Sequence, residues 1–190
     1  MGGGLALTYA LRGELRGRLA GTVVWSPMID VAKEGHVSAL KLAALKIGSL
    51  ILPDKQSVQH LPPEYMSRDP AVVEAFKNDP LCHDTGTLEG IAAMFDRAAE
   101  LRSKATARFD ARHPILVLHG SGDKVTNHDA SRRFVTALAQ VGDKDFRSYE
   151  GWYHKMHAEP GEDKFQFARY VAEWIAHRSK SGNVAGGSKL

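Results

Sequence analysis

An aspartate and a histidine that each follow an apolar run are the residues best placed to do chemistry. Asp123 ends the sequence His-Gly-Ser-Gly-Asp, directly after the apolar run at residues 114–119. His154 ends the sequence Glu-Gly-Trp-Tyr-His, directly after the run at residues 146–149. Ligands of open α/β sheets gather beyond the carboxyl ends of the strands, which is where these two loops are expected. The two residues could therefore form the acid and the base of a Ser-His-Asp triad.

This chemistry also requires a nucleophile. In such a triad the histidine takes a proton from the nucleophile and returns it to the leaving group, while the carboxylate holds the imidazole tautomer. The nucleophilic serine is expected on a Gly-x-Ser-x-Gly turn that enters a helix. The chain begins Met-Gly-Gly-Gly and continues directly into a helical pattern. If Met1 is the second variable residue of that turn and Gly2 its closing glycine, the serine would lie one position before Met1.

Simpler roles stay open for several of these polar residues. Asp123 could serve only as a hydrogen-bonding turn residue, and Ser121 and Ser26 are expected in a turn and at a strand end. His154 and His157 have the i, i+3 spacing of some metal sites. No third ligand is evident, so no metal is expected.

The composition is that of one globular domain. The 190 residues are 43% apolar and 25% charged, which are average values and exclude a disordered chain. The net charge is only +3, and Lys and Arg are spread along the chain, which excludes a nucleic-acid-binding footprint. A single cysteine, Cys82, excludes an internal disulfide, and it is expected to be a small buried apolar residue or a reactive thiol. No apolar run is long enough to predict a membrane span, and the N-terminus lacks the basic region of a signal peptide.

Hydrophobic patterning predicts strands separated by helices. Short β-branched or apolar runs predict strands at residues 22–25, 114–119 and 146–149. Helical periodicity predicts helices at residues 5–19, 35–52, 71–77, 87–108, 129–141 and 165–177. Asp69 is expected to cap the third helix, with Pro70 in its first turn. Strands that alternate with long helices indicate a parallel α/β architecture.

Short stretches in a fixed order give the chain a resemblance to a known family. They are Met1-Gly2-Gly3, Ser26-Pro27-Met28-Ile29, Ser67-Arg68-Asp69-Pro70, Asn78-Asp79-Pro80-Leu81, His119-Gly120-Ser121-Gly122-Asp123 and Tyr149-Glu150-Gly151-Trp152-Tyr153-His154. Over residues 1 to about 178, the chain resembles the C-terminal part of a monoacylglycerol lipase, a serine hydrolase with the α/β-hydrolase fold. Lysophospholipases and prolyl-type aminopeptidases belong to the same group.

The resemblance implies a division of the chain into core and cap. Residues 1–28 and 105–178 would belong to the hydrolase core, and residues 29–104 to a helical cap. The apolar helix expected at residues 35–52 would face the acyl chain and make transient contact with lipid surfaces.

The same resemblance implies the roles of the site residues. Asp123 would be the triad acid, His154 the triad histidine, and the backbone nitrogen of Met1 would occupy an oxyanion-hole position. The substrate would be a glyceride ester of the monoacylglycerol type, cleaved through an acyl-enzyme. No metal or organic cofactor would be required.

The family's nucleophilic serine, earlier strands and first oxyanion loop have no counterpart in these 190 residues. Because triad members act as a unit, we expect the chain alone to be an inefficient hydrolase. Its sheet would also end at an open apolar edge, which predicts poor solubility. Two other functions stay open: a truncated, non-catalytic remnant that binds lipid or a partner, and the same fold acting on a lysophospholipid, another ester or a peptide.

The end of the chain matches a targeting signal. Residues 179–190 are polar and glycine-rich, which predicts a flexible tail. The final residues Ser188, Lys189 and Leu190 match the C-terminal address that the peroxisomal import receptor reads. We therefore expect a peroxisomal protein whose Leu190 contacts that receptor; if the tripeptide is a coincidence, the expected location is the cytoplasm.

Overall fold

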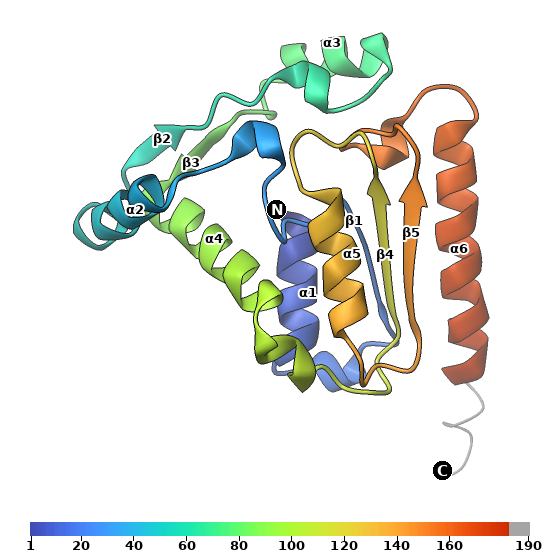
Figure 1. Ribbon diagram of the computed structural model, residues 1–190. Helices are drawn as coiled ribbons and strands as arrows, with labels where there is room; N and C mark the ends of the chain where they lie inside the picture. Colours follow the sequence, from blue (N-terminus) through green and yellow to red (C-terminus); the bar gives the residue numbers. More distant parts are fainter. Residues whose placement is uncertain (183–190) are drawn as a thin grey trace.

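A three-stranded parallel sheet forms the centre of the molecule. The computed structural model describes residues 1–182 of the chain. The strands lie in the order β1-β4-β5, and both neighbouring pairs are parallel (Figure 1). Their bounds are β1 (Thr22–Trp25), β4 (Ile115–Gly120) and β5 (Lys144–Tyr149). The predicted parallel α/β architecture is therefore confirmed.

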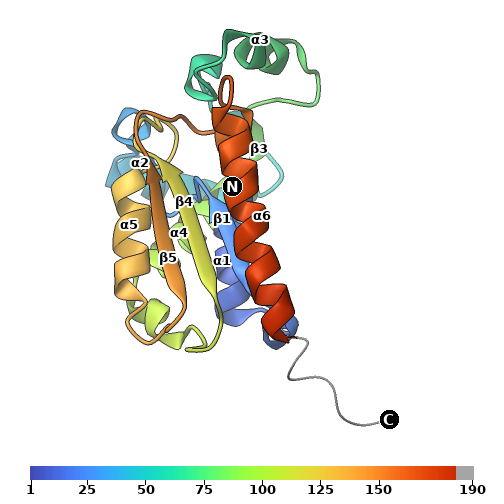
Figure 2. The same ribbon diagram turned by 90° about the vertical axis from the view of Figure 1, so that its right-hand side faces the viewer.

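Helices cover both faces of this sheet. One face is covered by α1 (Gly2–Arg12), α4 (Leu88–Arg102) and α5 (His128–Ala137), and the other by α6 (Asp163–Gly182) (Figure 2). Successive side chains of β4 point to opposite faces of the sheet, and all residues of β4 are buried, so both faces must be covered. Ile115 and Val117 pack into the cluster formed with α1, α4 and α5, whereas Leu116 and Leu118 pack with residues of α6.

Four helices end four or more residues away from the ends that the periodicity predicts. Helix α5 ends at Ala137 rather than at residue 141. Helix α1 ends at Arg12, and the short 3-10 helix η1 (Arg16–Arg18) follows it. Helix α4 ends at Arg102, before the 3-10 helix η4 (Lys104–Arg108). Helix α6 continues to Gly182, so residues 179–182 are helical and were wrongly assigned to a flexible tail. The rest of that tail, including the final tripeptide, lies outside the described residues.

The segment between β1 and α4 forms a layer beyond the carboxyl ends of the central strands (Figure 1). It contains η2 (Lys33–Gly35), α2 (Ala39–Ile51), β2 (Gln56–Val58), η3 (Pro63–Tyr65), α3 (Pro70–Asn78) and β3 (Thr85–Thr87). The Asp69 carboxylate accepts a hydrogen bond from the Ala71 N–H at 2.9 Å, so the predicted cap of α3 is present. The antiparallel pair β2–β3 was not predicted, because three-residue strands are too short to show an alternating pattern.

Helix α2 is the most exposed apolar element of the described chain. None of its residues is buried, and the exposed fractions of Leu40, Leu50 and Ile51 are 81%, 85% and 70%. Contiguous exposed apolar side chains of this kind mark interaction surfaces. Within residues 1–182, no helix has the length and apolarity needed to cross a membrane.

Strand β1 forms one edge of the described sheet, and a cavity lies beside it. The cavity has a volume of about 450 Å³ and is lined by Val23, Trp25 and Ser26 of this edge, together with Met1 and His154. Trp25 is 37% exposed, so the edge combines unpaired strand backbone with apolar surface.

This edge is expected to make the isolated chain self-associate. Unpaired strand edges with exposed apolar surface drive association at roughly micromolar concentrations. Sedimentation velocity of the purified chain should show species larger than the monomer whose fraction grows with concentration. A monodisperse monomer with one cooperative unfolding transition would show instead that the chain is a self-sufficient domain.

Candidate functional site

The turn after β4 fixes the carboxylate of Asp123. Its Oδ1 accepts hydrogen bonds from the backbone N–H groups of Val125, at 2.7 Å, and Thr126, at 3.0 Å. Asp123 is only 8% exposed. These bonds are the local contacts that aspartate makes in a turn, and they orient Oδ2 toward the neighbouring loop.

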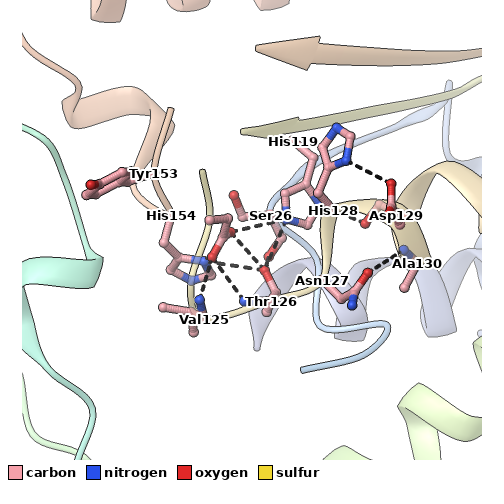
Figure 3. Close-up of polar contacts among 12 residues, drawn as sticks. Ser26, His119, Val125, Thr126, Asn127, His128, Asp129, Ala130, Tyr153 and His154 are labelled. Carbon is pink, nitrogen blue, oxygen red and sulfur yellow. Dashed lines mark hydrogen bonds and ion pairs between the residues drawn. The ribbon is translucent and has the colours of Figure 1, made fainter. Parts of the chain in front are cut away.

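The loop after β5 carries His154 to this carboxylate. Because β4 and β5 are parallel neighbours, the loops that follow them begin side by side at the same edge of the sheet. Nδ1 of His154 lies 2.9 Å from Oδ2 of Asp123. Figure 3 shows His154 together with Val125 and Thr126 of the turn that Asp123 begins. The structure thus brings the predicted acid and base into direct hydrogen-bonding contact.

A second histidine, which sequence reasoning missed, shares the same carboxylate. His119 is completely buried at the end of β4, and its Nε2 lies 3.1 Å from Oδ2 of Asp123. Its other nitrogen, Nδ1, lies 2.8 Å from the hydroxyl of buried Ser131. An ionised carboxylate can only accept, so Nε2 carries the proton that it donates. In the neutral ring, Nδ1 then accepts from the Ser131 hydroxyl, which fixes the tautomer of His119. The sequence signal was a polar residue inside an apolar strand.

These contacts keep Asp123 ionised. Burial by itself would raise the pKa of this carboxyl group, but the hydrogen bonds from His119 and His154, and the electrostatic interaction with these two rings, hold it well below its usual range. The Thr126 hydroxyl donates a further bond to Oδ2 at 3.0 Å. The carboxylate is therefore available as a fixed negative charge beside His154 throughout the physiological pH range.

His154 faces two cavities. With its Nδ1 bound to Asp123, Nε2 is the nitrogen left for proton transfer. His154 lines both the cavity beside β1 and a second one of about 440 Å³ that extends under the segment between β1 and α4. Met1 also lines both cavities, so a substrate could reach the histidine and the start of α1 together.

The N-terminus of α1 presents hydrogen-bond donors at this place. Met1 is the N-cap residue of α1, and the first N–H groups of a helix have no partner within it. They also carry the positive end of the helix dipole. The close approach of α1 depends on glycine, because a Cβ on Gly4 would lie 2.9 Å from the Met28 carbonyl oxygen and one on Gly3 would lie 3.0 Å from Pro27 Cα. Such an arrangement could stabilise an oxyanion next to His154.

The terminal ammonium of Met1 should make the stability of the chain depend on pH. Burial lowers the pKa of this ammonium, the Asp123 carboxylate raises it, Arg97 lowers it, and the net change is downward. The unfolded state, with a pKa of about 8, then binds more protons, so stability rises as the pH increases toward about 8. We expect the urea midpoint of a chain with a free Met1 amino group to rise between about pH 6 and pH 9. An N-acetylated chain serves as the control and should show a smaller rise; equal rises would contradict the burial of this charge.

Other polar residues considered from the sequence take different places. The Ser121 hydroxyl accepts a hydrogen bond from the Gly151 N–H at 2.8 Å and so joins the two loops as a turn residue. Ser26 follows β1 with a positive φ of 43°, and its buried hydroxyl has no partner among the described residues. Cys82 is only partly buried and donates to the Asp79 carboxylate.

His157 packs edge-on against Trp25. Within residues 1–182, no group of three or more metal-binding side chains comes together.

Residues 1–161 match the family of serine aminopeptidases S33, also named Hydrolase_4. The chain belongs to this family. It is 32% identical to the monoacylglycerol lipase of Mycolicibacterium smegmatis, over 92% of this chain and 59% of that one. It is 27% identical to human monoglyceride lipase, over 97% of this chain and 59% of that one. The crystal structure of the Paleococcus ferrophilus monoacylglycerol lipase matches 93% of this chain and 65% of that one, with 27% identity and a TM-score of 0.83.

Membership in this family confirms the resemblance to monoacylglycerol lipase-like α/β-hydrolases that the ordered stretches predict. It also supports a hydrolase of the lipase or esterase type. The chain spans about half the length of the curated relatives that it matches.

Proposed function

We propose that the chain is the part of a monoacylglycerol lipase-type serine hydrolase that carries the catalytic acid and histidine. The observation that supports this most directly is the 2.9 Å contact between Asp123 Oδ2 and His154 Nδ1, at the carboxyl ends of adjacent parallel strands and beside the N-terminus of α1. The division into core residues 1–28 and 105–178 and cap residues 29–104 belongs to the same proposal.

The proposed reaction needs a serine directly before Met1. Its Oγ attacks the ester carbonyl while Nε2 of His154 takes its proton, and the new oxyanion accepts a hydrogen bond from the backbone N–H at Met1. Collapse of this intermediate breaks the ester bond, and His154 gives the proton to the departing glycerol oxygen. Water, activated in the same way, then releases the fatty acid from the serine. Asp123 holds the imidazole and stabilises its charged form.

The exposed apolar surface of α2 supports a lipid substrate. Leu40, Ile47, Leu50 and Ile51 are all more than half exposed, and α2 lies in the segment that roofs the second cavity. A surface of this kind can bind the acyl side of a lipid aggregate transiently and bring the ester to His154.

The experiment joins this chain to the segment that the proposal requires. We call a protein in which strands and a Gly-x-Ser turn precede Met1 the completed protein; that segment is either encoded upstream of the Met1 codon or taken from a relative. We expect the completed protein to hydrolyse monoacylglycerol, its His154→Ala variant to be inactive, and residues 1–190 alone to be nearly inactive.

Each other outcome identifies another function. Faster hydrolysis of a lysophospholipid or a peptide would change the substrate class. A completed protein without hydrolase activity, together with lipid binding by residues 1–190, would favour a non-catalytic remnant. Efficient turnover by residues 1–190 alone would contradict the need for the serine.

We also propose that the final residues Ser188, Lys189 and Leu190 direct the protein to peroxisomes. A lipase there would supply fatty acid to oxidation. A fluorescent fusion that ends in the full sequence should enter peroxisomes, and one that lacks these three residues should stay in the cytoplasm. Entry of the shortened fusion would contradict the proposal.

A further inference from the structure

A second buried carboxylate lies near His154 but takes no part in the triad. Glu159 is completely buried, and its Oε1 accepts a hydrogen bond from the Tyr153 N–H at 2.6 Å. Its Oε2 accepts from Nε of Arg68 at 2.6 Å. A buried carboxylate is tolerated only when it is paired and hydrogen-bonded. Arg68 belongs to the segment between η3 and α3, so the pair joins two parts of the chain that are 91 residues apart.

Further bonds connect the same two segments. The Ser67 hydroxyl donates to the Ala158 carbonyl oxygen at 2.8 Å, and Nη2 of Arg68 donates to Oδ2 of Asp163 at 2.5 Å. The Lys155 N–H donates to the Met66 carbonyl oxygen at 2.6 Å. Residues 66–68 therefore form a strap across the loop that carries His154.

The strap holds the backbone on both sides of His154. The residue before it, Tyr153, is bound to Glu159, which Arg68 holds in place. The residue after it, Lys155, is bound directly to the Met66 carbonyl. Among the described residues, the hydrogen-bond partners of the imidazole are on the β4 side: Asp123 and, at 3.5 Å, Thr126. The carboxylate thus fixes the ring, while the strap fixes the backbone from which the ring projects.

We propose that Arg68 and Glu159 are positioning residues for His154. Through them, the segment that leads into α3 sets the place of the histidine relative to Asp123. If α3 and its neighbours shift when a substrate enters, the bonds at Tyr153 and Lys155 transmit that shift to the base. The inference rests on the proposed function only in treating His154 as that base.

The test compares two arginines with similar surroundings. Arg68 binds carboxylates and lies 5.7 Å from the Trp152 ring; Arg178 binds the Asp143 carboxylate through two nitrogens and lies 3.9 Å from the Trp174 ring, on α6. Amide hydrogen exchange of residues 1–190 is followed by mass spectrometry at low concentration. We expect Arg68→Met to make the amides of residues 153–155 exchange about tenfold faster, and Arg178→Met to leave them unchanged. Arg68→Lys should restore part of the protection.

A second measurement separates positioning from simple stability. In the completed protein, Arg68→Met should lower kcat by about 10²-fold with little change in KM, because a displaced base impairs chemistry more than binding. If Arg68→Met does not fold, Ser67→Ala replaces it in both measurements and should accelerate exchange at the same residues. Exchange at residues 153–155 that matches Arg178→Met would overturn the inference. A completed protein without activity, but with accelerated exchange in Arg68→Met, would overturn the proposed function and leave the strap intact.

Discussion

Asp123→Asn in the completed protein should lower kcat by about 10⁴-fold. The reason is that the two carboxylate oxygens have different hydrogen-bond partners. Oδ1 accepts from two backbone N–H groups, at Val125 and Thr126, which cannot rotate away, so asparagine should keep its oxygen there. The other groups that bond Oδ2 can adapt, because the Thr126 hydroxyl can rotate and the His119 proton can move to Nδ1. The asparagine NH₂ group then faces His154 and donates to Nδ1. The imidazole proton moves to Nε2, and the nitrogen that should take the proton from serine can no longer accept it.

Asp143→Asn is the matched control for this substitution. Asp143 also binds a basic side chain, that of Arg178, but it lies directly before β5, outside both cavities lined by His154. Its replacement should change kcat less than about twofold. Initial rates of monoacylglycerol hydrolysis are measured for both variants. A loss below about tenfold for Asp123→Asn would mean that Asp123 is only a turn residue and that another group orients His154.

Gly120→Ala should destabilise the chain by about 3 kcal/mol, at the upper end of the range for overpacking. Gly120 is the last residue of β4, and a Cβ there would lie 2.2 Å from the Trp152 carbonyl oxygen and 2.6 Å from its carbon. Both atoms are backbone and cannot rotate away. Either the β4 end or the loop that carries His154 must move. This loss would be a large part of a domain's total stability of about 5–15 kcal/mol.

Gly142→Ala provides the control for this prediction. A Cβ on Gly142 would meet only the Ala111 carbonyl oxygen, at an ordinary contact distance of 3.9 Å. Its urea midpoint should stay close to that of the unchanged chain, while that of Gly120→Ala falls. A destabilisation below about 1 kcal/mol in Gly120→Ala would show that the two loops are less tightly packed than the structure has them.

Much of the fold could be predicted from the sequence because its main signals are local. The apolar run in β4 and the short β-branched run in β1 are typical of strands in the interior of a fold, and each predicts one directly. The spacing of helices between them requires parallel connections. The same connections place Asp123 and His154 beyond the carboxyl ends of neighbouring strands, although their catalytic role stays a prediction.

Helix ends were less predictable, because their cause is tertiary. Apolar residues continue past Gly13, but Gly13 is the C-cap residue of α1, with extended backbone and an N–H that donates to the Tyr9 carbonyl oxygen, and the chain leaves the helix there. The polar residues 179–182 extend α6, since a helix already packed on the sheet can continue for a turn at little cost.

The sequence by itself determined that the strands are parallel, which family the chain resembles, and which two loops could carry an acid and a base. Only the tertiary structure decided what surrounds them. His119 lies four residues from Asp123 and Arg68 lies 91 residues from Glu159, yet both pairs form hydrogen bonds between groups that are buried or partly buried. The local pattern marks His119 only as a polar residue inside an apolar strand, and it does not mark Arg68 as the partner of Glu159. The need to satisfy a buried charge arises only when folding removes water from it.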